Sequence, residues 1–133
     1  MDHQTLVYSV EHVADYSVDI AKHIIMLEES QQKIPDHLLT LMFNAGTEAV
    51  NLYDGAVNTF FSKDVTIAVE ILEQRQNVEK LDREIASKAF MSKQENALTI
   101  CAICSIRDDI KKIAECAADM AEIAINRAYK ITT

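Results

Sequence analysis

The sequence has few of the residues that interrupt helices. Its 133 residues include two glycines and one proline, and it contains no tryptophan. Glycine and proline are the main helix breakers, so their shortage leaves few places where long helices could be broken. Alanine, isoleucine, leucine, glutamate and lysine are abundant instead. This composition predicts an all-α protein.

Clustered positive charge and long apolar runs are also lacking. The net charge is −8, from 21 acidic and 13 basic residues, and no stripe of Lys and Arg could follow a nucleic-acid backbone. An acidic surface repels anionic lipid head groups but suits cations or a basic protein partner. No apolar run approaches 18 residues, and the N-terminal residues resemble no cleavable leader. We therefore expect no nucleic-acid binding, no signal peptide and no membrane insertion.

Cysteine is sparse, and the common catalytic motifs are missing. Cys101, Cys104 and Cys116 cannot all pair within one chain, so reduced thiols in the cytoplasm are the simplest interpretation. Cys101-x-x-Cys104 has no second pair and lies within a predicted helix, which favours small residues beside a core over a zinc or redox site. No Gly-rich phosphate loop, Gly-x-Ser-x-Gly or His-Glu-x-x-His motif occurs. We expect a protein that is not an enzyme.

Three short polar segments divide the chain into helices, which we predict near residues 4–30, 36–61, 64–91 and 95–130. Pro35 and Asp36 suit the start of the second helix, and Asp64 suits the start of the third. Because the connections are short, each helix should run antiparallel to the one before it. The prediction is a single domain, 1–133, folded as an elongated antiparallel up-down four-helix bundle.

Helical periodicity assigns faces to these helices. The predicted core stripe of the last helix consists of Ile106, Ile110, Ile113, Ala117, Met120, Ala124 and Ile131. The charged remainder of the third helix, interpreted as a solvated face with ion pairs such as Glu79 with Arg83, consists of Glu70, Glu73, Arg75, Glu79, Lys80, Asp82, Arg83 and Glu84. The apolar arc of the first helix is wider than one neighbour requires. Its excess predicts burial against another subunit or a missing segment of chain.

One sequence motif occurs twice, 100 residues apart, at residues 10–21 and 110–121. In the first copy Glu11, Asp15 and Asp19 recur every four residues, so their carboxylates follow one ridge of a helix about 6 Å apart. A hard or borderline cation would relieve their mutual repulsion, and carboxylate oxygens suit Mg²⁺, Mn²⁺, Ca²⁺ or iron. His12 and His23 flank this ridge and would also suit zinc or iron. An ordinary solvated acidic face is the alternative.

The first copy, together with residues 60–72 and 78–85, resembles the PhoU family of phosphate-uptake regulators. The family places an acid-x-x-x-Asp motif on the helix that closes each three-helix unit, and Glu11, Asp15 and Asp19 fit that motif. The second copy carries Lys111 in place of the leading acid and Glu115 in place of the aspartate, and a nearby ammonium competes with a cation for carboxylates. The metal candidates are Glu11, Asp15, Asp19, Glu115, Asp119 and Glu122.

The resemblance implies a domain organisation as well as a function. Residues 1–31 look like the closing helix of one unit, and residues 36–133 look like a complete three-helix unit. By resemblance, the chain is expected to be a cytoplasmic, metal-binding regulator of phosphate uptake or phosphate signalling that contacts a transporter ATPase or a sensor histidine kinase. A homodimer would restore the missing helices, and excision from a longer protein is the other explanation.

Two other functions remain open, and a third is disfavoured. PhoU-like domains also accompany potassium-transport proteins, so regulation of cation transport is the first alternative. A helical adaptor that binds no metal is the second. A di-iron oxidase is disfavoured, because its Glu-x-x-His motif on two helices is absent from this sequence.

Overall fold

The computed structural model describes residues 2–93 and 96–132, and these residues form four α-helices. The helices are α1 (Asp2–Glu29), α2 (Asp36–Ser62), α3 (Val65–Met91) and α4 (Ala97–Thr132). The all-α prediction is confirmed, and the expected helix boundaries agree to within a few residues. Glu95, where the sequence placed the start of the last helix, lies outside the described residues.

A polar cap begins α3, and residues in the left-handed conformation follow the ends of α1, α2 and α3, in the connections that the sequence predicted. Asp64 caps α3, because its carboxylate accepts hydrogen bonds from the backbone N–H groups of Thr66 at 3.0 Å and Ile67 at 3.3 Å. Gln31, Lys63 and Lys93 have φ values of 55°, 61° and 51°, in the left-handed region that terminates helices. Long polar residues thus take the position that glycine usually occupies, which is consistent with the shortage of glycine.

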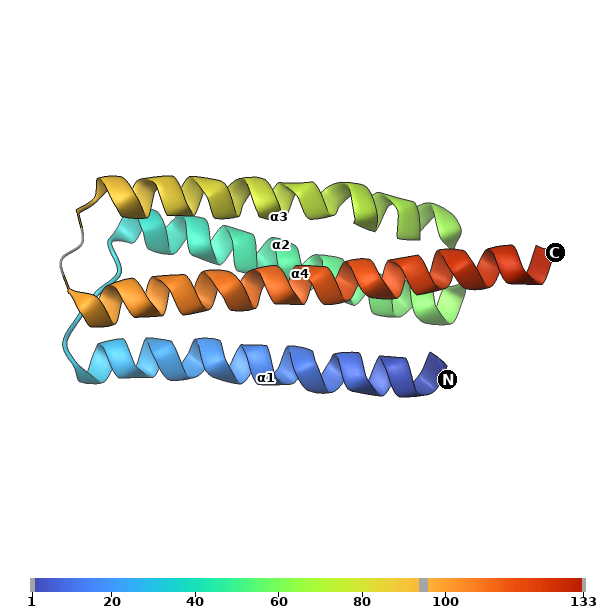
Figure 1. Ribbon diagram of the computed structural model, residues 1–133, viewed down its shortest axis with the longest axis horizontal. Coiled ribbons are helices and arrows are strands. Elements are labelled where there is room, and N and C mark those ends of the chain that lie inside the picture. The colour runs from blue at the N-terminus through green and yellow to red at the C-terminus, as the bar shows by residue number, and fades with distance from the viewer. Residues whose placement is uncertain (1, 94–95, 133) are drawn as a thin grey trace.

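Consecutive helices alternate in direction, as Figure 1 shows, but they do not close into a four-membered ring. Helices α2, α3 and α4 all pack against one another, whereas α1 packs extensively against α4 alone. The arrangement is therefore a three-helix bundle with a fourth helix attached to one side of α4. It refines the expected four-helix bundle.

Small residues let the backbones of α2 and α4 approach closely. Fully buried alanines line both helices, and larger side chains fill the space between them and α3. The buried members include Ala45, Ala49, Ala56, Ala117, Ala121, Leu38, Val78, Ile85, Ile106, Ile110, Ile113 and Met120. The predicted core stripe of the last helix is confirmed where it is described; the side chain of Ile131 lies outside that part of the chain.

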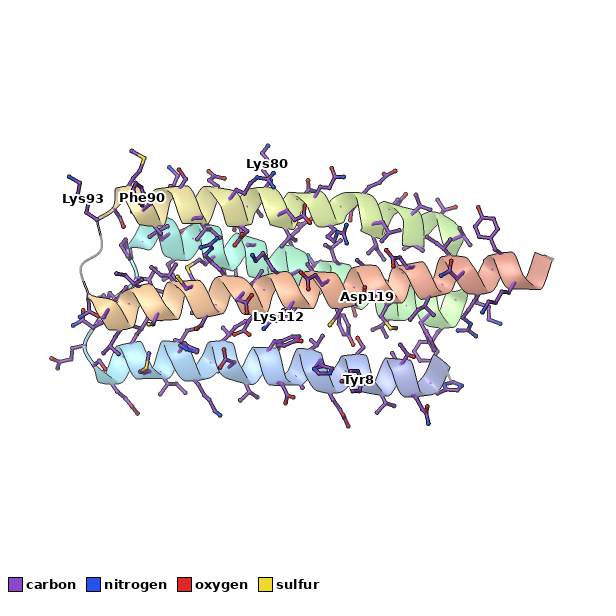
Figure 2. The ribbon with its side chains drawn as sticks, viewed as in Figure 1. Tyr8, Lys80, Phe90, Lys93, Lys112 and Asp119 are labelled. Carbon is purple, nitrogen blue, oxygen red and sulfur yellow. The ribbon has the colours of Figure 1, made fainter. Side chains whose placement is uncertain are left out.

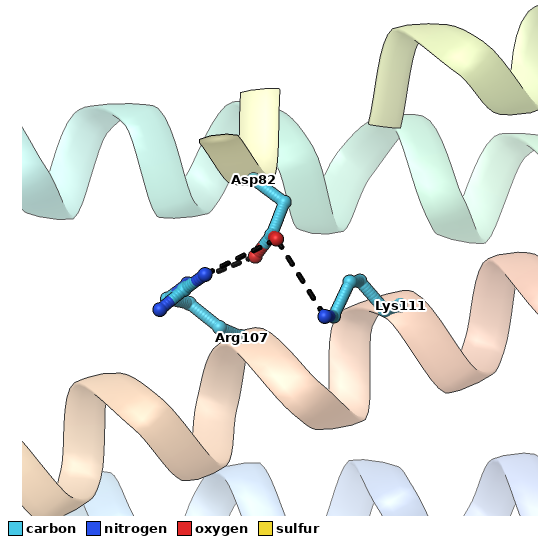
Figure 3. Close-up of polar contacts among 3 residues, drawn as sticks. All are labelled: Asp82, Arg107 and Lys111. Atoms are coloured by element: carbon cyan, nitrogen blue, oxygen red, sulfur yellow. Dashed lines mark hydrogen bonds and ion pairs between the residues drawn. The ribbon is translucent and has the colours of Figure 1, made fainter. Parts of the chain in front are cut away.

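One ion-pair cluster joins α3 to α4 inside the bundle. The Arg107 guanidinium donates two hydrogen bonds to the Asp82 carboxylate, at 2.9 Å from Nε and 3.2 Å from Nη2 (Figure 3). The ammonium of Lys111 lies 3.6 Å from the same carboxylate, and the Asp82 side chain is 11% exposed. The expectation of a solvated Asp82 was therefore wrong, because two cations on the neighbouring helix compensate its burial.

Replacement of Asp82 by alanine should destabilise the fold by about 2 kcal/mol, because it leaves two partly buried cations without their carboxylate. The expected cost is below that of a fully buried pair, since the Arg107 and Lys111 side chains are 23% and 41% exposed. Urea unfolding followed by circular dichroism measures this loss.

Glu79→Ala is the matched control on the same helix. Glu79 lies 3.8 Å from Arg75 in a half-exposed pair, so its removal should cost less than about 0.5 kcal/mol. Equal destabilisation by the two substitutions would contradict the assigned role of Asp82.

Candidate functional site

From its first acid to its last, the acidic ridge of α1 turns towards the bundle. Glu11 and Asp15 are exposed, whereas Asp19 is half-buried against α4. Residues four apart on a helix are rotated by about 40°, so a ridge of three acids drifts across the helix surface. Only the last acid of the predicted motif therefore reaches the interface between α1 and α4.

Asp19 meets Asp109, a residue outside the predicted motif. Asp109 is 5% exposed, and its Oδ2 has no hydrogen-bond donor among the described residues. The neighbouring acceptor is the Asp19 carboxylate, so the two oxygens form a hydrogen bond only if they share a proton. Burial, and then this hydrogen bond, raise the pKa of Asp109 to about 7. The hydrogen bond from Asp109 lowers the pKa of Asp19, and the positive charges of His23, Lys22 and Lys112 add to this effect.

His23 supports the same corner of the interface. Its Nδ1 lies 2.8 Å from the backbone carbonyl oxygen of Asp19 and 3.4 Å from Asp19 Oδ2. The short contact to the carbonyl orients the ring, with Nδ1 as the donor. His23 therefore contacts Asp19 mainly at the backbone carbonyl oxygen of that residue.

The second acidic motif lies on the outer face of α4. Glu115, Asp119 and Glu122 are all exposed. Desolvation, followed by the nearby charge of Glu122, raises the pKa of Asp119. Lys111 reaches Asp82 on α3, so the ammonium expected to compete for the motif's carboxylates has a buried partner instead.

A small cleft of about 260 Å³ separates α1 from this part of α4. A ladder of rings lines its α1 side: the centroids of Tyr8 and His12 lie 4.2 Å apart, and those of His12 and Tyr16 lie 6.0 Å apart. Lys112 lies over the Tyr16 ring at 5.6 Å and pairs with Asp108 at 2.8 Å. Figure 2 shows Lys112 and Asp119 on α4, with Tyr8 on the neighbouring α1. His12 is thus packed between two aromatic rings.

The six predicted ligands are not brought together in one place. Within residues 2–93 and 96–132, no three His, Cys, Asp or Glu side chains lie close enough to hold a metal ion as a group. Asp19 lies against Asp109, whereas Glu115 and Asp119 line the cleft beside His12. The described residues of one chain therefore do not form a closed metal site, and metal binding by these acids stays a prediction.

The cysteines are consistent with their interpretation as free thiols. Cys101 and Cys104 are exposed, Cys116 is half-buried, and none of the three forms a disulfide. Burial, followed by the charge of Asp119, raises the pKa of the Cys116 thiol. This shift disfavours the reactive thiolate.

Comparison with known families identifies the family to which this chain belongs. The family described as PhoU domain matches residues 43–124, which run from α2 through α3 to most of α4. This match spans more than half of the chain, and the protein belongs to the PhoU family. The curated proteins and the solved structures gave no match. Family membership supports a phosphate-related regulatory role.

The sequence interpretation missed Asp109, because it assigned that residue neither to the core stripe nor to a site. A usable signal was present: at 100° per residue, Asp109 falls beside the core stripe that contains Ile106 and Ile113.

Among the described helices, none is long and apolar enough to span a membrane.

The pair of Asp19 and Asp109 predicts a pH-dependent stability. A carboxyl group whose folded pKa is about 7 stabilises the fold below its unfolded pKa of 3.8, and this stabilisation is lost as the pH rises towards 7. Asp109→Asn cannot ionise, and its amide can donate to Asp19 at every pH. The variant should therefore be more stable than the wild type at pH 8, by about 1–2 kcal/mol, and should come closest to it near pH 3.5.

Thermal unfolding of both proteins across this pH range measures the difference. Asp108→Asn is the control, because Asp108 is the adjacent carboxylate on the same helix and is exposed. The explanation fails if Asp109→Asn changes the stability equally at both pH values.

Proposed function

We propose that this protein regulates phosphate uptake or phosphate-dependent signalling in the cytoplasm, without being an enzyme, through contact with a transporter ATPase or a sensor histidine kinase. The family match across α2, α3 and α4 is the observation that carries the proposal. The exposed acids on adjacent helices support it, because they provide a surface for a protein partner.

The proposed contact surface is an acidic strip formed by α1 and α4. It consists of Glu11, Asp15, Glu115, Asp119 and Glu122, all of which are exposed. With a net charge of −8, the whole chain would attract a basic surface and speed the encounter with it. Exposed charges act on association rates more than on final affinity, which suits a reversible regulatory contact.

Cation binding to this strip is the second part of the proposal. Because the described acids form no group of three, water would have to complete the coordination of an ion held by one or two carboxylates. Mg²⁺ is bound in this way in many proteins, and its hard oxygen preference fits the available donors. The missing third ligand equally supports the second candidate function, a helical adaptor that binds its partner without metal.

Elemental analysis separates these two candidates. We expect the purified protein to retain divalent metal after dialysis, and Glu11→Ala combined with Asp15→Ala to lose most of it. Asp36→Ala combined with Asp64→Ala removes the same charge at the starts of α2 and α3, and it should retain the metal. Equal metal content in the wild type and the first double variant would favour the adaptor.

Partner capture tests the phosphate assignment. Tagged protein recovered from its native cells under low phosphate should carry a phosphate-transporter ATPase or a sensor kinase, and Glu115→Lys combined with Asp119→Lys should lose it by reversing the charge of the strip. Uptake of ³²P-phosphate in a strain lacking the chain should change and should be restored by the wild type alone. Recovery of a potassium-uptake protein with unchanged phosphate uptake would overturn the phosphate assignment in favour of cation transport.

A further inference from the structure

A groove lies between α3 and α4, at the end of the molecule where α3 finishes and α4 begins. It has a volume of about 310 Å³. Two alanines of α3, Ala86 and Ala89, and two isoleucines of α4, Ile100 and Ile103, contribute its apolar lining. In other proteins a cavity of about 150 Å³ holds a benzene ring, so this groove has room for a leucine or phenylalanine side chain.

The charge of the groove is opposite to the charge of the whole chain. The chain carries a net charge of −8, yet the charged residues that line the groove within the described part of the chain, Lys93 and Arg107, are both cations. Asp82 pairs with two cations, Arg107 and Lys111, so this cluster keeps a net positive charge. Salt screens exposed charges beyond about 8 Å, so a bound segment responds mainly to these nearby cations. The groove therefore suits an acidic ligand.

Arg107 is held in position for a second carboxylate. Asp82 accepts hydrogen bonds from Nε and Nη2, which fixes the plane of the guanidinium (Figure 3). The third nitrogen, Nη1, donates to no described residue, and the Arg107 side chain is 23% exposed. A guanidinium can receive a second carboxylate along its Nη1–Nη2 edge. Because Asp82 has already ordered the side chain, binding at this edge would lose little conformational entropy.

Exposed apolar side chains surround the same groove. Phe90 is 86% exposed, and Met91 and Ile100 are exposed as well. Figure 2 places Phe90 and Lys93 together at the end of α3. An aromatic side chain beside a hollow and an ordered arginine is typical of the residues that dominate binding energy in protein interfaces.

We propose that this groove binds an acidic segment of another protein, with one apolar side chain in the hollow and a neighbouring Asp or Glu on the open edge of Arg107. Exposed apolar residues beside lysine also occur on proteins that bind anionic membranes. A hollow and a partly buried, ordered guanidinium fit a side chain and its carboxylate better than a lipid surface. The groove is separate from the acidic strip, so the inference does not depend on the proposed function. The chain would then bind a basic partner and an acidic partner through different surfaces.

Peptide selection against the full chain tests the proposal. The probe is a phage library of random peptides of about 15 residues, long enough to form a short helix. Selected peptides should carry a leucine or an aromatic residue close to Asp or Glu. Their affinity is then measured by fluorescence anisotropy with labelled synthetic peptides. Replacing the acids of a selected peptide by the matching amides should weaken its binding by at least about 10-fold.

Three substitutions in the groove test its separate parts. Phe90→Ala should weaken peptide binding by at least about 10-fold, because it removes the aromatic wall. Lys93→Glu should weaken it by about 5-fold through charge reversal at the rim. Arg107→Lys keeps a cation beside Asp82 but removes the open edge, and it should cost about 10-fold. Circular dichroism checks the fold of each variant, and the first two replace exposed side chains.

Lys88→Glu is the matched control. Lys88 is exposed in the last turn of α3, and it lies about 200° around the helix from the lining residue Ala86. The substitution makes the same charge change as Lys93→Glu at a short distance from the groove. This variant should bind the selected peptides as the wild type does.

Several results would overturn the proposal. They are a selection that enriches no peptide, enriched peptides without acids, and equal weakening by Lys93→Glu and Lys88→Glu. Sedimentation with phosphatidylserine–phosphatidylcholine vesicles that Phe90→Ala abolishes would assign this face to a membrane instead. Self-association of the wild type that Phe90→Ala abolishes in sedimentation velocity would assign it to a second copy of the chain.

Discussion

Helix α4 contacts each of the other three helices, and the structure depends on the different chemistry of its flanks. Isoleucine and alanine face α2, where close backbone approach requires small side chains. Arg107 and Lys111 face α3 and share the carboxylate of Asp82. Asp109 and Cys116 face α1. With these flanks occupied, the remaining strip of α4 is the surface that carries Glu115, Asp119 and Glu122.

Because each flank of α4 meets a different helix, the helices themselves could be predicted from the sequence, but the ion-pair cluster of Asp82, Arg107 and Lys111 could not. The period of apolar residues identified the core stripe of α4, and polar joints located the helix ends to within a few residues. Asp82, however, belongs to a charged helix, and its partner Arg107 lies 25 residues away on another element. A pattern within one helix cannot reveal which charge will find a partner across an interface.

The same limitation applies to the candidate site. Spacing within α1 correctly indicates that Glu11, Asp15 and Asp19 follow one ridge, but it contains no information about the register of α1 against α4. That register places Asp19 beside Asp109 and Tyr16 beneath the ammonium of Lys112. The acids of the second motif are exposed on α4, and among the described residues they form no group of three with the acids of α1. Residue types indicated the possible chemistry, whereas the helix register determined which groups became neighbours.

Helix α1 has the fewest packing partners among the described helices. It packs extensively against α4 alone, and the carboxyl groups of Asp19 and Asp109 face each other across that interface. Its acidic flank, which carries Glu11 and Asp15, and its apolar flank, which carries Ile20 and Ile24 beside α2, point in different directions. The one extensive interface with α4 therefore holds both flanks in place, and local opening of that interface would move the two flanks together.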